Sequence, residues 1–281
     1  MNFNVRRQGL RLSGLTMRLT AWVLAVGVLL AVAPAAATAQ TLGLDFSVPP
    51  QVSNSQTEVP LQWYTDRYAP AGFTAASGVL TETVTPAGFN PTESFYNTQG
   101  NKFDLLAGTT SVSIQVRVPM AWETSNERLA GFWATAIDTT YVNNGDGDFP
   151  IIEFQGPITS CIPGPGCYTN GGVAGFYGWN NTGAGSWDYI GLPAGFRYNA
   201  YYKLTITLNN PTPAQSNGYF TYTVSDTNGG NPVSINSPLS DPLDLFLGNV
   251  ILEGYNYDNT ATIQWKLLKF SFDSNGQIVW N

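Results

Sequence analysis

The sequence predicts an all-β fold, an antiparallel sandwich or barrel, on three observations. Apolar and polar residues alternate with period two in nearly every segment after residue 60. Turn-forming residues fill the spaces between these segments, with 29 Gly and 18 Pro in 281 residues. No long amphipathic helix separates the strands, so parallel βαβ architecture is excluded. All-β domains of this length commonly form one unit.

The clearest strand is Ser111–Val118, in which the valines and isoleucine fall on one face and Ser, Gln and Arg on the other. Aromatic and β-branched residues, which favour pleated strands, mark the other candidates. These are Val79–Val84, Leu129–Ala136, Phe149–Phe154, Val173–Trp179, Trp187–Ile190, Leu204–Leu208, Tyr219–Val224, Asn249–Tyr257 and Ile263–Phe272.

Turn chemistry and one short helix complete the prediction. Pro-Ala-Gly-Phe occurs three times, starting at Pro70, Pro86 and Pro193, and its Pro and Gly suit a type I turn. The best helix candidate is Asp241–Gly248, with Asp as the N-cap, Pro next and Gly at the end. We expect it to span one or two turns.

Residues 1–39 have the order of a secretory signal peptide. Four arginines precede an apolar run from Leu19 to Val32, and small residues end at Ala39, after which we expect cleavage. The apolar run is short for a membrane span, and no second run of spanning length follows. We therefore expect residues 40–60 to be an N-terminal lead-in or edge strand, residues 61–281 to be the β-domain, and the product to be secreted, periplasmic or on the cell surface.

Composition excludes several classes of function. Histidine is absent, which rules out Ser-His-Asp and Cys-His nucleophiles and His-ligated metals. Neither a phosphate-binding P-loop nor a dinucleotide-binding glycine motif occurs. Without the signal, eight basic residues face 19 acidic ones, a net charge of −11. So acidic a chain is not expected to bind nucleic acid or anionic membranes, and polyuronates are disfavoured as well.

Two cysteines enclose a short Pro/Gly loop. In an exported protein, Cys161 and Cys167 are expected to form a disulfide. The ring is small, so the gain in stability is on the order of 2 kcal/mol, and the bond would hold a loop tip. A reactive thiol is the alternative, but no base or metal partner is near in sequence.

The chain resembles the concanavalin A-like lectin/glucanase superfamily, and in particular secreted laminin-G-like jelly rolls. The stretches that carry the resemblance are Val112–Pro119, Gly131–Trp133, Pro150–Phe154, Gly175–Trp179 and Ile263–Phe272. The resemblance covers most of the chain from Leu61 onward, and it lies in the order of the strands and in their residue composition. The resemblance implies a jelly roll of two curved antiparallel sheets with a concave face and little helix. Its members include lectins, glycanases, polysaccharide lyases and adhesive modules, so the fold alone does not choose a function.

Two glutamates lie in apolar strands where a glycanase would place its acids. Glu153 should share a face with Phe149, Ile151 and Gln155, and Phe149 and Ile151 occupy the places where retaining glycanases of this superfamily need further acids. Glu253 could complete a catalytic pair if its strand lies beside that of Glu153. The alternative is that each acid is isolated and hydrogen-bonded to a Tyr, Asn or Arg side chain. We therefore assign no catalytic residue, and name these two if the protein is an enzyme.

The loop Asn143–Asp148 is the candidate metal site. Asn144, Asp146 and Asp148 place oxygen ligands two residues apart on a Gly-rich loop, which suits calcium. The pattern lacks the Gly and the distal Glu of an EF-hand. The alternative is a solvated turn, where the same residue types are common. Calcium is the one cofactor that the sequence suggests.

Aromatic residues beside short polar ones form the candidate ligand site. Sugar rings present apolar faces and hydroxyl groups, so they require an aromatic platform next to amides or carboxylates. The residues that we name for ligand binding are Tyr177, Trp179, Asn181, Trp187, Asp188, Tyr255 and Tyr257. The alternative is that about half of such rings are sandwich core.

The sequence therefore favours a secreted, non-catalytic, lectin-like module that binds a glycan or polysaccharide. Two other classes remain open: a glycoside hydrolase that uses Glu153 and Glu253, and a structural or adhesive surface protein. The relative placement of the two glutamates discriminates the first two most directly.

Overall fold

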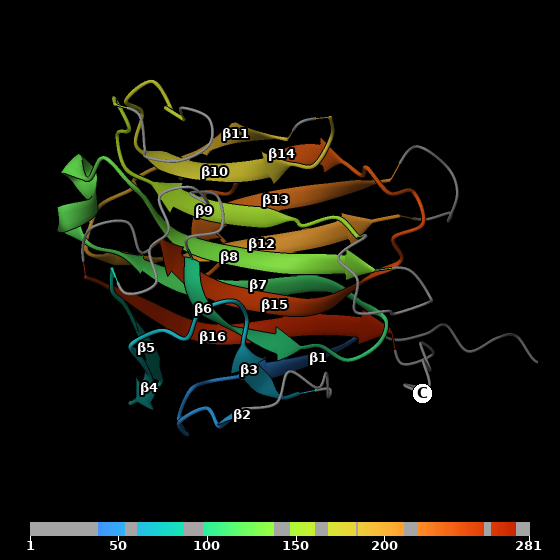
Figure 1. Cartoon of the computed structure of the whole chain (residues 1–281). Coiled ribbons are helices and arrows are strands. Elements are labelled where there is room, and N and C mark those ends of the chain that lie inside the picture. Colours follow the sequence, from blue (N-terminus) through green and yellow to red (C-terminus); the bar gives the residue numbers. More distant parts are fainter. Residues whose placement is uncertain are drawn as a thin grey trace, which may run out of the picture. The chain divides into compact units, whose positions relative to one another are not determined.

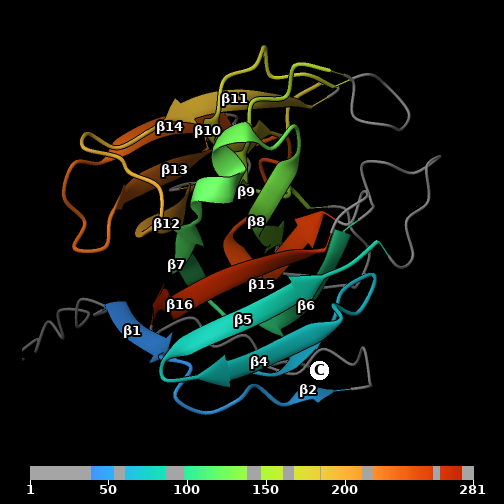
Figure 2. The same ribbon diagram turned by 90° about the vertical axis from the view of Figure 1, so that its left-hand side faces the viewer.

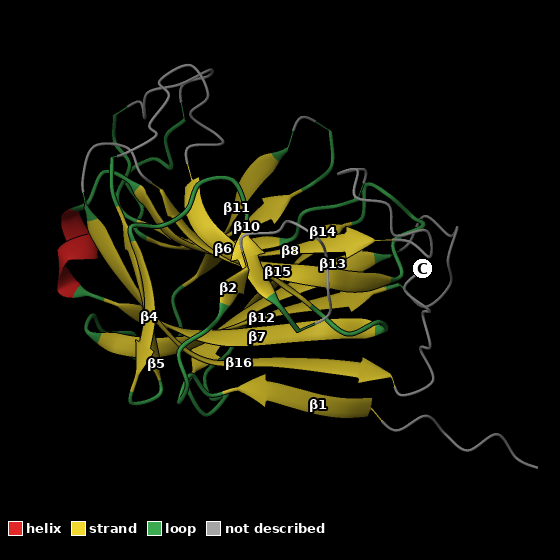
Figure 3. Cartoon of the chain, turned by 60° about the horizontal axis from the view of Figure 1, so that its bottom comes forward, coloured by secondary structure: helices red, strands yellow, loops and turns green. Residues whose placement is uncertain are grey.

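Alternating strands build two eight-stranded sheets in the computed structural model, which describes residues 39–53, 61–86, 98–137, 147–160, 168–183, 185–210, 218–255 and 260–273. All of them belong to the unit formed by residues 37–281. Figure 1 shows two layers, and Figure 3 shows that strands dominate and that the helix is one short 3-10 turn, Met120–Thr124. The predicted all-β sandwich is confirmed.

Sheet A carries the strands on which the sequence pattern is clearest. Its order is β14 (Val233–Pro238), β13 (Tyr219–Asp226), β12 (Ala200–Asn209), β7 (Thr109–Val118), β16 (Ala261–Asp273), β5 (Val79–Val84) and β4 (Gly72–Ala76), with β1 (Ala39–Leu44) also paired to β16. Every neighbouring pair is antiparallel. Figure 2 shows β16, β5 and β4 side by side.

Sheet B is the other layer. Its order is β11 (Ser186–Gly191), β10 (Gly175–Asn180), β9 (Ile151–Gln155), β8 (Arg128–Ile137), β15 (Phe246–Tyr255), β6 (Thr98–Asp104), β3 (Trp63–Thr65) and β2 (Val52–Ser53). Its pairs are antiparallel except β2 with β3, which is parallel.

The main core lies between the sheets. From β7, Val112, Ile114, Val116 and Val118 all enter it, as the alternation predicts. An acid is buried there too: Trp265 Nε1 donates a hydrogen bond of 3.0 Å to Glu82 Oε2. Each sheet thus keeps one face in the core and turns the other outward.

The helix expected over Asp241–Gly248 is wrong. Asp241 Oδ1 accepts the backbone N–H of Leu243 at 2.8 Å, so the capping side chain closes a turn instead of starting a helix. Strand β15 begins at Phe246, and Leu247 enters the core between the sheets. The signals for a helix start and a turn are chemically the same, and pairing with β8 decides between them.

The segment 40–60 contains the edge strand that was one of its two expected forms. Strand β1 pairs with β16 from Ala39↔Asp273 to Leu44↔Leu268. In the described part of the chain, no helix has the length and apolar character that crossing a membrane requires.

A close approach between the sheets gives a stability prediction. A Cβ on Gly178 would lie 2.4 Å from Tyr222 Cδ2, in the core. Gly178→Ala should therefore lower the free energy of unfolding by about 1–3 kcal/mol in urea titrations. Gly72→Ala is the matched strand control, because its Cβ would meet Thr83 at an ordinary 3.5 Å. Equal stability of the two variants would contradict the packing described.

Candidate functional site

The outer face of sheet B gathers most of the residues named from the sequence. It carries a second apolar cluster, separate from the main core, built on side chains that point away from sheet A. The buried members are Trp133, Ile151, Ile158, Ile251 and Tyr255, and the partly buried ones are Phe149, Tyr168, Trp179 and Trp187. Strand register places the polar and aromatic residues of this face in rows that run across the sheet.

The two glutamates share one of these rows. Glu153 of β9 lies opposite Gly131 of β8, and Gly131 lies opposite Glu253 of β15. The glutamates therefore stand on the same face, on the two strands that flank β8. Two strand spacings separate their Cα atoms by about 10 Å. This is the placement that the sequence left open for an acid pair.

Both carboxylate oxygens of Glu153 accept hydrogen bonds. Its side chain is 0% exposed, and Arg128 grips it with two bonds, Nε to Oε1 at 2.6 Å and Nη2 to Oε2 at 2.8 Å. Gln155 Nε2 adds a bond of 2.8 Å to Oε1, and Tyr168 donates its hydroxyl to Gln155 Oε1 at 2.6 Å. Burial raises the pKa of Glu153 to about 7, against the opposing effect of the Arg128 charge.

Arg128 is held between aromatic rings. Its guanidinium carbon lies 3.8 Å from the ring centroid of Tyr255 and 4.5 Å from that of Trp187, and the residue is 4% exposed. Arg128 therefore links the carboxylate of β9 to aromatic side chains of β11 and β15. For Glu153 the structure matches the alternative of an acid bonded to an arginine.

Glu253 has a different environment. It is 0% exposed, and Arg67 Nη1 lies 4.0 Å from its Oε2. Among the described residues, none forms a hydrogen bond of good geometry to either carboxyl oxygen, although Thr98 lies near enough to lower the pKa of Glu253. Burial raises the pKa of Glu253 to about 8, opposed by Arg67 and reinforced by the charge of Asp66. Burial therefore favours the protonated form of this carboxyl group.

Four rings on β10 and β11 form what we call the aromatic platform: Tyr177, Trp179, Trp187 and Tyr189. Tyr177 pairs with Tyr189 and Trp179 with Trp187, each pair with ring centroids 5.1 Å apart. Tyr189 is 46% exposed, the two tryptophans are half-buried, and Tyr177 is buried. The platform thus offers rings to solvent at the edge of sheet B.

The loop after β10 supports the platform. Gly185 has φ +76°, and a Cβ there would lie 2.1 Å from Trp179 Cζ2, so the Trp179 ring lies directly on the loop backbone. Asn181 Oδ1 accepts the N–H of Phe149 at 2.9 Å, which ties the same loop to β9. Asn181 therefore acts as a support beneath the rings.

The remaining residues named for ligand binding are placed differently. Asp188 lies between Trp187 and Tyr189 in β11 and so points to the opposite side of the sheet, where its carboxylate accepts a bond of 3.2 Å from Asn180. Tyr255 is buried against Arg128. Tyr257 lies outside the described residues.

Only part of the candidate metal loop belongs to the described residues. Asn144 and Asp146 lie outside the described residues, as do Cys161 and Cys167. Asp148 is buried and accepts hydrogen bonds from Ser240 Oγ and from the N–H groups of Ser240 and Asp241, and burial raises its pKa. Among the described residues, no group of three His, Cys, Asp or Glu side chains could hold a metal. Asp148 therefore anchors its loop to the turn before β15.

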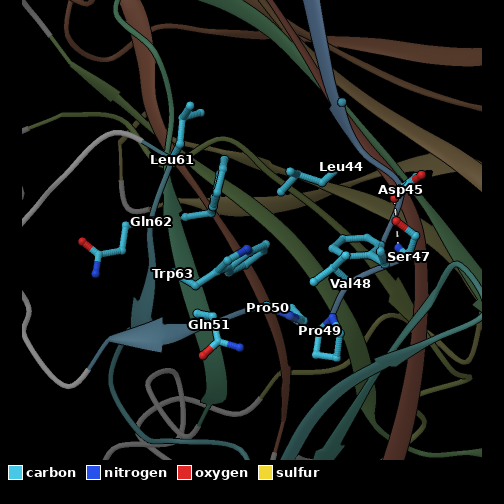
Figure 4. Close-up of a pocket in the computed structure, with 13 residues that line it drawn as sticks. Leu44, Asp45, Ser47, Val48, Pro49, Pro50, Gln51, Leu61, Gln62 and Trp63 are labelled. Atoms are coloured by element: carbon cyan, nitrogen blue, oxygen red, sulfur yellow. Dashed lines mark hydrogen bonds between the residues drawn. The ribbon is translucent and has the colours of Figure 1, made fainter.

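A pocket of about 530 Å³ lies elsewhere, between β1, the following loop and β3 (Figure 4). Its walls are largely apolar and come from residues 43–51, 61–63 and Phe103. The one acid, Asp45, is bonded to the N–H of Ser47, and hydrogen bonds from Ser47 lower its pKa. None of the residues proposed from the sequence lines this pocket.

The sequence pattern did not single out Arg128 and Arg67 for this face. Arg128 lies directly before the expected strand Leu129–Ala136, so the sequence predicts its place at the start of a strand. The sequence does not indicate that Glu153 is its partner. Arg67 lies in a short loop after β3, with its guanidinium 5.3 Å from the Trp133 ring centroid. The register of β8 with β9 identifies Arg128 as part of this site, and the pairing of β3 with β6 and of β6 with β15 brings Arg67 to Glu253.

A double-mutant cycle tests the buried pair. Arg128→Met should lower the free energy of unfolding by about 3–5 kcal/mol, because it removes the partner of a carboxyl group that stays buried, whether that group keeps its charge or takes up a proton. Arg128→Met combined with Glu153→Gln should recover much of this loss, since the unpaired acid is gone. Urea unfolding of both single variants and the double variant measures the coupling, and strictly additive losses would contradict the pairing.

The raised carboxyl pKa values predict how stability changes with pH. Burial also raises the pKa of Glu82 in the core. Since the folded chain holds these protons above the pH at which an unfolded glutamate loses them, stability should fall as pH rises from about 5 to 8, by a few kcal/mol in total. Glu253→Gln should flatten the curve most between pH 6 and 8, in urea titrations across that range. Stability that rises through this window would contradict the assigned burial.

Comparison with known proteins finds similarity in fold only. The chain matches no protein-family model and no curated protein. Among solved structures, it is similar to the CBM2 module of the evolved Dit of Lactobacillus casei BL23 phage J-1, at TM-score 0.49 and 12% identity over 87% of this chain and 99% of that one. An alginate lyase in complex with alginate trisaccharide gives 0.49 and 12% over 74% and 87%. Lectin II from Ulex europaeus gives 0.44 and 13% over 83% and 98%. Lectins and carbohydrate-active enzymes, the classes that the resemblance in the sequence implies, are thus among the structures that it matches.

Proposed function

We propose that the protein is a carbohydrate-binding module without catalytic activity, and that it binds glycans on the aromatic platform of β10 and β11. The observation that carries the proposal is the platform itself: two tryptophans and an exposed tyrosine on one face at the edge of a sheet. Sugar rings stack their apolar C–H faces on such rings, and rigid aromatic side chains lose little entropy on binding.

The surroundings of the platform suit a neutral polysaccharide chain. The rings of Trp179 and Trp187 lie side by side across the strand pair, with Thr182 exposed in the loop after β10 as a hydroxyl partner. The network from Arg128 fixes Trp187 from below. A preformed platform of this kind binds without a large ordering cost.

Burial argues against catalysis by the two glutamates. A general acid must touch the glycosidic oxygen that it protonates, and both Glu153 and Glu253 are 0% exposed. Glu153 also gives both carboxylate oxygens to Arg128, which leaves it no capacity as nucleophile or base. We assign these acids a structural role beneath the binding face.

A glycoside hydrolase is the second candidate, and one observation favours it. Glu153 and Glu253 share a face and a row, with the bare backbone of Gly131 between them. Their strand spacing approaches the separation of about 6.5–9.5 Å at which inverting enzymes hold their carboxyl groups. The raised pKa of Glu253 would suit a general acid. This function requires the covering side chains to move away from both acids.

Export forms part of the proposal. The basic, apolar and small-residue order of residues 1–39 supports a signal peptide, and an oxidising compartment would join Cys161 to Cys167. The platform would then meet extracellular polysaccharide.

Substitutions on the platform test the binding site. Tyr189→Ala and Trp179→Ala should each weaken binding about tenfold or more on a glycan array, because each removes a stacking surface. Tyr219→Ala is the matched control, since Tyr219 is an exposed strand tyrosine on the outer face of sheet A. Urea midpoints of the variants show whether the fold is retained.

The same samples separate the two candidate functions. We expect no release of reducing ends from any polysaccharide that the protein binds, with or without Glu153→Gln. Hydrolysis that is lost in both Glu153→Gln and Glu253→Gln would replace the binding module with the enzyme.

A further inference from the structure

Basic residues are unevenly distributed over the two sheets. Eight Lys and Arg residues follow residue 39, and four of them point outward from sheet A: Arg117, Lys203, Lys266 and Lys269. Their strand neighbours Val116, Leu204, Trp265 and Leu268 are buried in the core, which fixes the direction of the basic side chains. We call these four residues the basic patch.

Strand register makes the basic patch continuous. Gln115 of β7 lies opposite Lys203 of β12 on one side and Lys266 of β16 on the other. Arg117 is two residues along β7 from Gln115, and Lys269 lies opposite Ser113. The four cations thus occupy three adjacent strands, with neighbouring strands about 5 Å apart.

No acid neutralises the basic patch within the described part of the chain. Each ion pair found there uses Arg67, Lys102 or Arg128, which face acids on or beside sheet B. Arg117 instead donates to the amide oxygens of Gln264 and Asn199, both at 3.4 Å. Lys266 Nζ lies 4.3 Å from the Tyr201 ring centroid. In a chain of net charge −7, the basic patch is a local reversal of sign.

Rows of hydroxyl and amide side chains continue the same face. Cross-strand hydrogen bonds join Thr41 to Ser271 at 3.0 Å, Ser111 to Thr207 at 3.1 Å, Thr221 to Asn236 at 2.9 Å and Thr223 to Ser234 at 2.9 Å. Register sets these residues in two neighbouring rows, Asn236–Thr221–Thr207–Ser111–Ser271–Thr41 and Ser234–Thr223–Thr205–Ser113–Lys269. The face therefore combines four unpaired charges with a regular array of short donors and acceptors.

We propose that this outer face of sheet A binds a polyuronate, a polysaccharide with one carboxylate and free hydroxyl groups on each sugar. The carboxylates would meet the basic patch, and the sugar hydroxyls would meet the Ser and Thr rows. A sulfated polysaccharide has part of its hydroxyl groups esterified and so offers fewer hydroxyl donors to those rows. This surface is separate from the aromatic platform on sheet B, and it goes beyond the function proposed for that platform.

Other anionic partners fit the surface less well. Duplex nucleic acid carries dense charge, and the acidic remainder of the chain would repel the phosphates that extend past four cations. An anionic membrane requires apolar side chains for insertion, whereas the two rows consist of Ser, Thr, Asn and Lys. The polyuronate is the partner that offers both carboxylates to the basic patch and hydroxyl groups to the two rows.

Binding to immobilised polygalacturonate tests the proposal, with residues 40–281 at about 25 mM and 200 mM NaCl. We expect binding at low salt that weakens about tenfold or more at high salt, as ion pairing requires. Lys203→Gln with Lys266→Gln should weaken it at least tenfold at low salt. For single substitutions, Lys269→Gln should weaken binding severalfold, and Arg197→Gln, which removes an exposed arginine away from the patch, should leave it within about twofold.

Three arms separate this surface from the alternatives. Neutral dextran should not depend on the basic patch, and Trp179→Ala should keep polygalacturonate binding, so failure here and failure of the platform are distinguishable. Duplex DNA or dextran sulfate bound more tightly than polygalacturonate would overturn the choice of partner. Equal binding of the wild type and the Lys203→Gln, Lys266→Gln variant would overturn the surface itself, provided that both unfold at the same urea midpoint.

Discussion

The buried bond between Arg128 and Glu153 is the interaction on which the rest of the outer face of sheet B depends. Two charge-assisted hydrogen bonds of 2.6 and 2.8 Å satisfy the carboxylate, and the rings of Tyr255 and Trp187 cover the guanidinium. Such a pair tolerates burial only when its geometry and further hydrogen bonds are good, and Gln155 and Tyr168 extend the network. The same interaction occupies both carboxylate oxygens of Glu153 and packs against one ring of the aromatic platform.

The basic residues of this chain have different environments on the outer faces of the two sheets. Three of the basic residues after residue 39 face acids on or beside sheet B, and four lie unpaired on the outer face of sheet A. The net charge of the chain sets its electrostatic field at long range. A polymer bound along one sheet interacts mainly with the charges of that sheet's own surface. The prediction from the sequence that polyuronates are disfavoured rests on the net value alone, and the structure supplies the reason to propose the opposite for one surface.

Alternation predicted the fold well where one face of a strand is apolar, as in β7, β12 and β13. Strand β6 carries no such signal, because Thr98, Gln99 and Asn101 are buried although polar, and it is recognised only by its pairing with β15. At the site, the platform rings follow from composition and from period two. The same periodicity turns Asp188 to the opposite side, and the bulge between Arg128 and Gly131 sets the register that brings Arg128 to Glu153, which no local pattern reveals.

We expect glycan to bind over Trp179 and Trp187 while the acids beneath remain covered. Titration of the 15N-labelled protein with an oligosaccharide chosen from the glycan array, followed through the tryptophan indole N–H resonances, tests this binding site. The Trp179 and Trp187 resonances should show saturable shifts, and Trp265 of the core should stay unchanged. Shifts confined to Trp63, whose side chain lines the pocket beside β3, would place the ligand in that pocket and rule out the aromatic platform as the binding site.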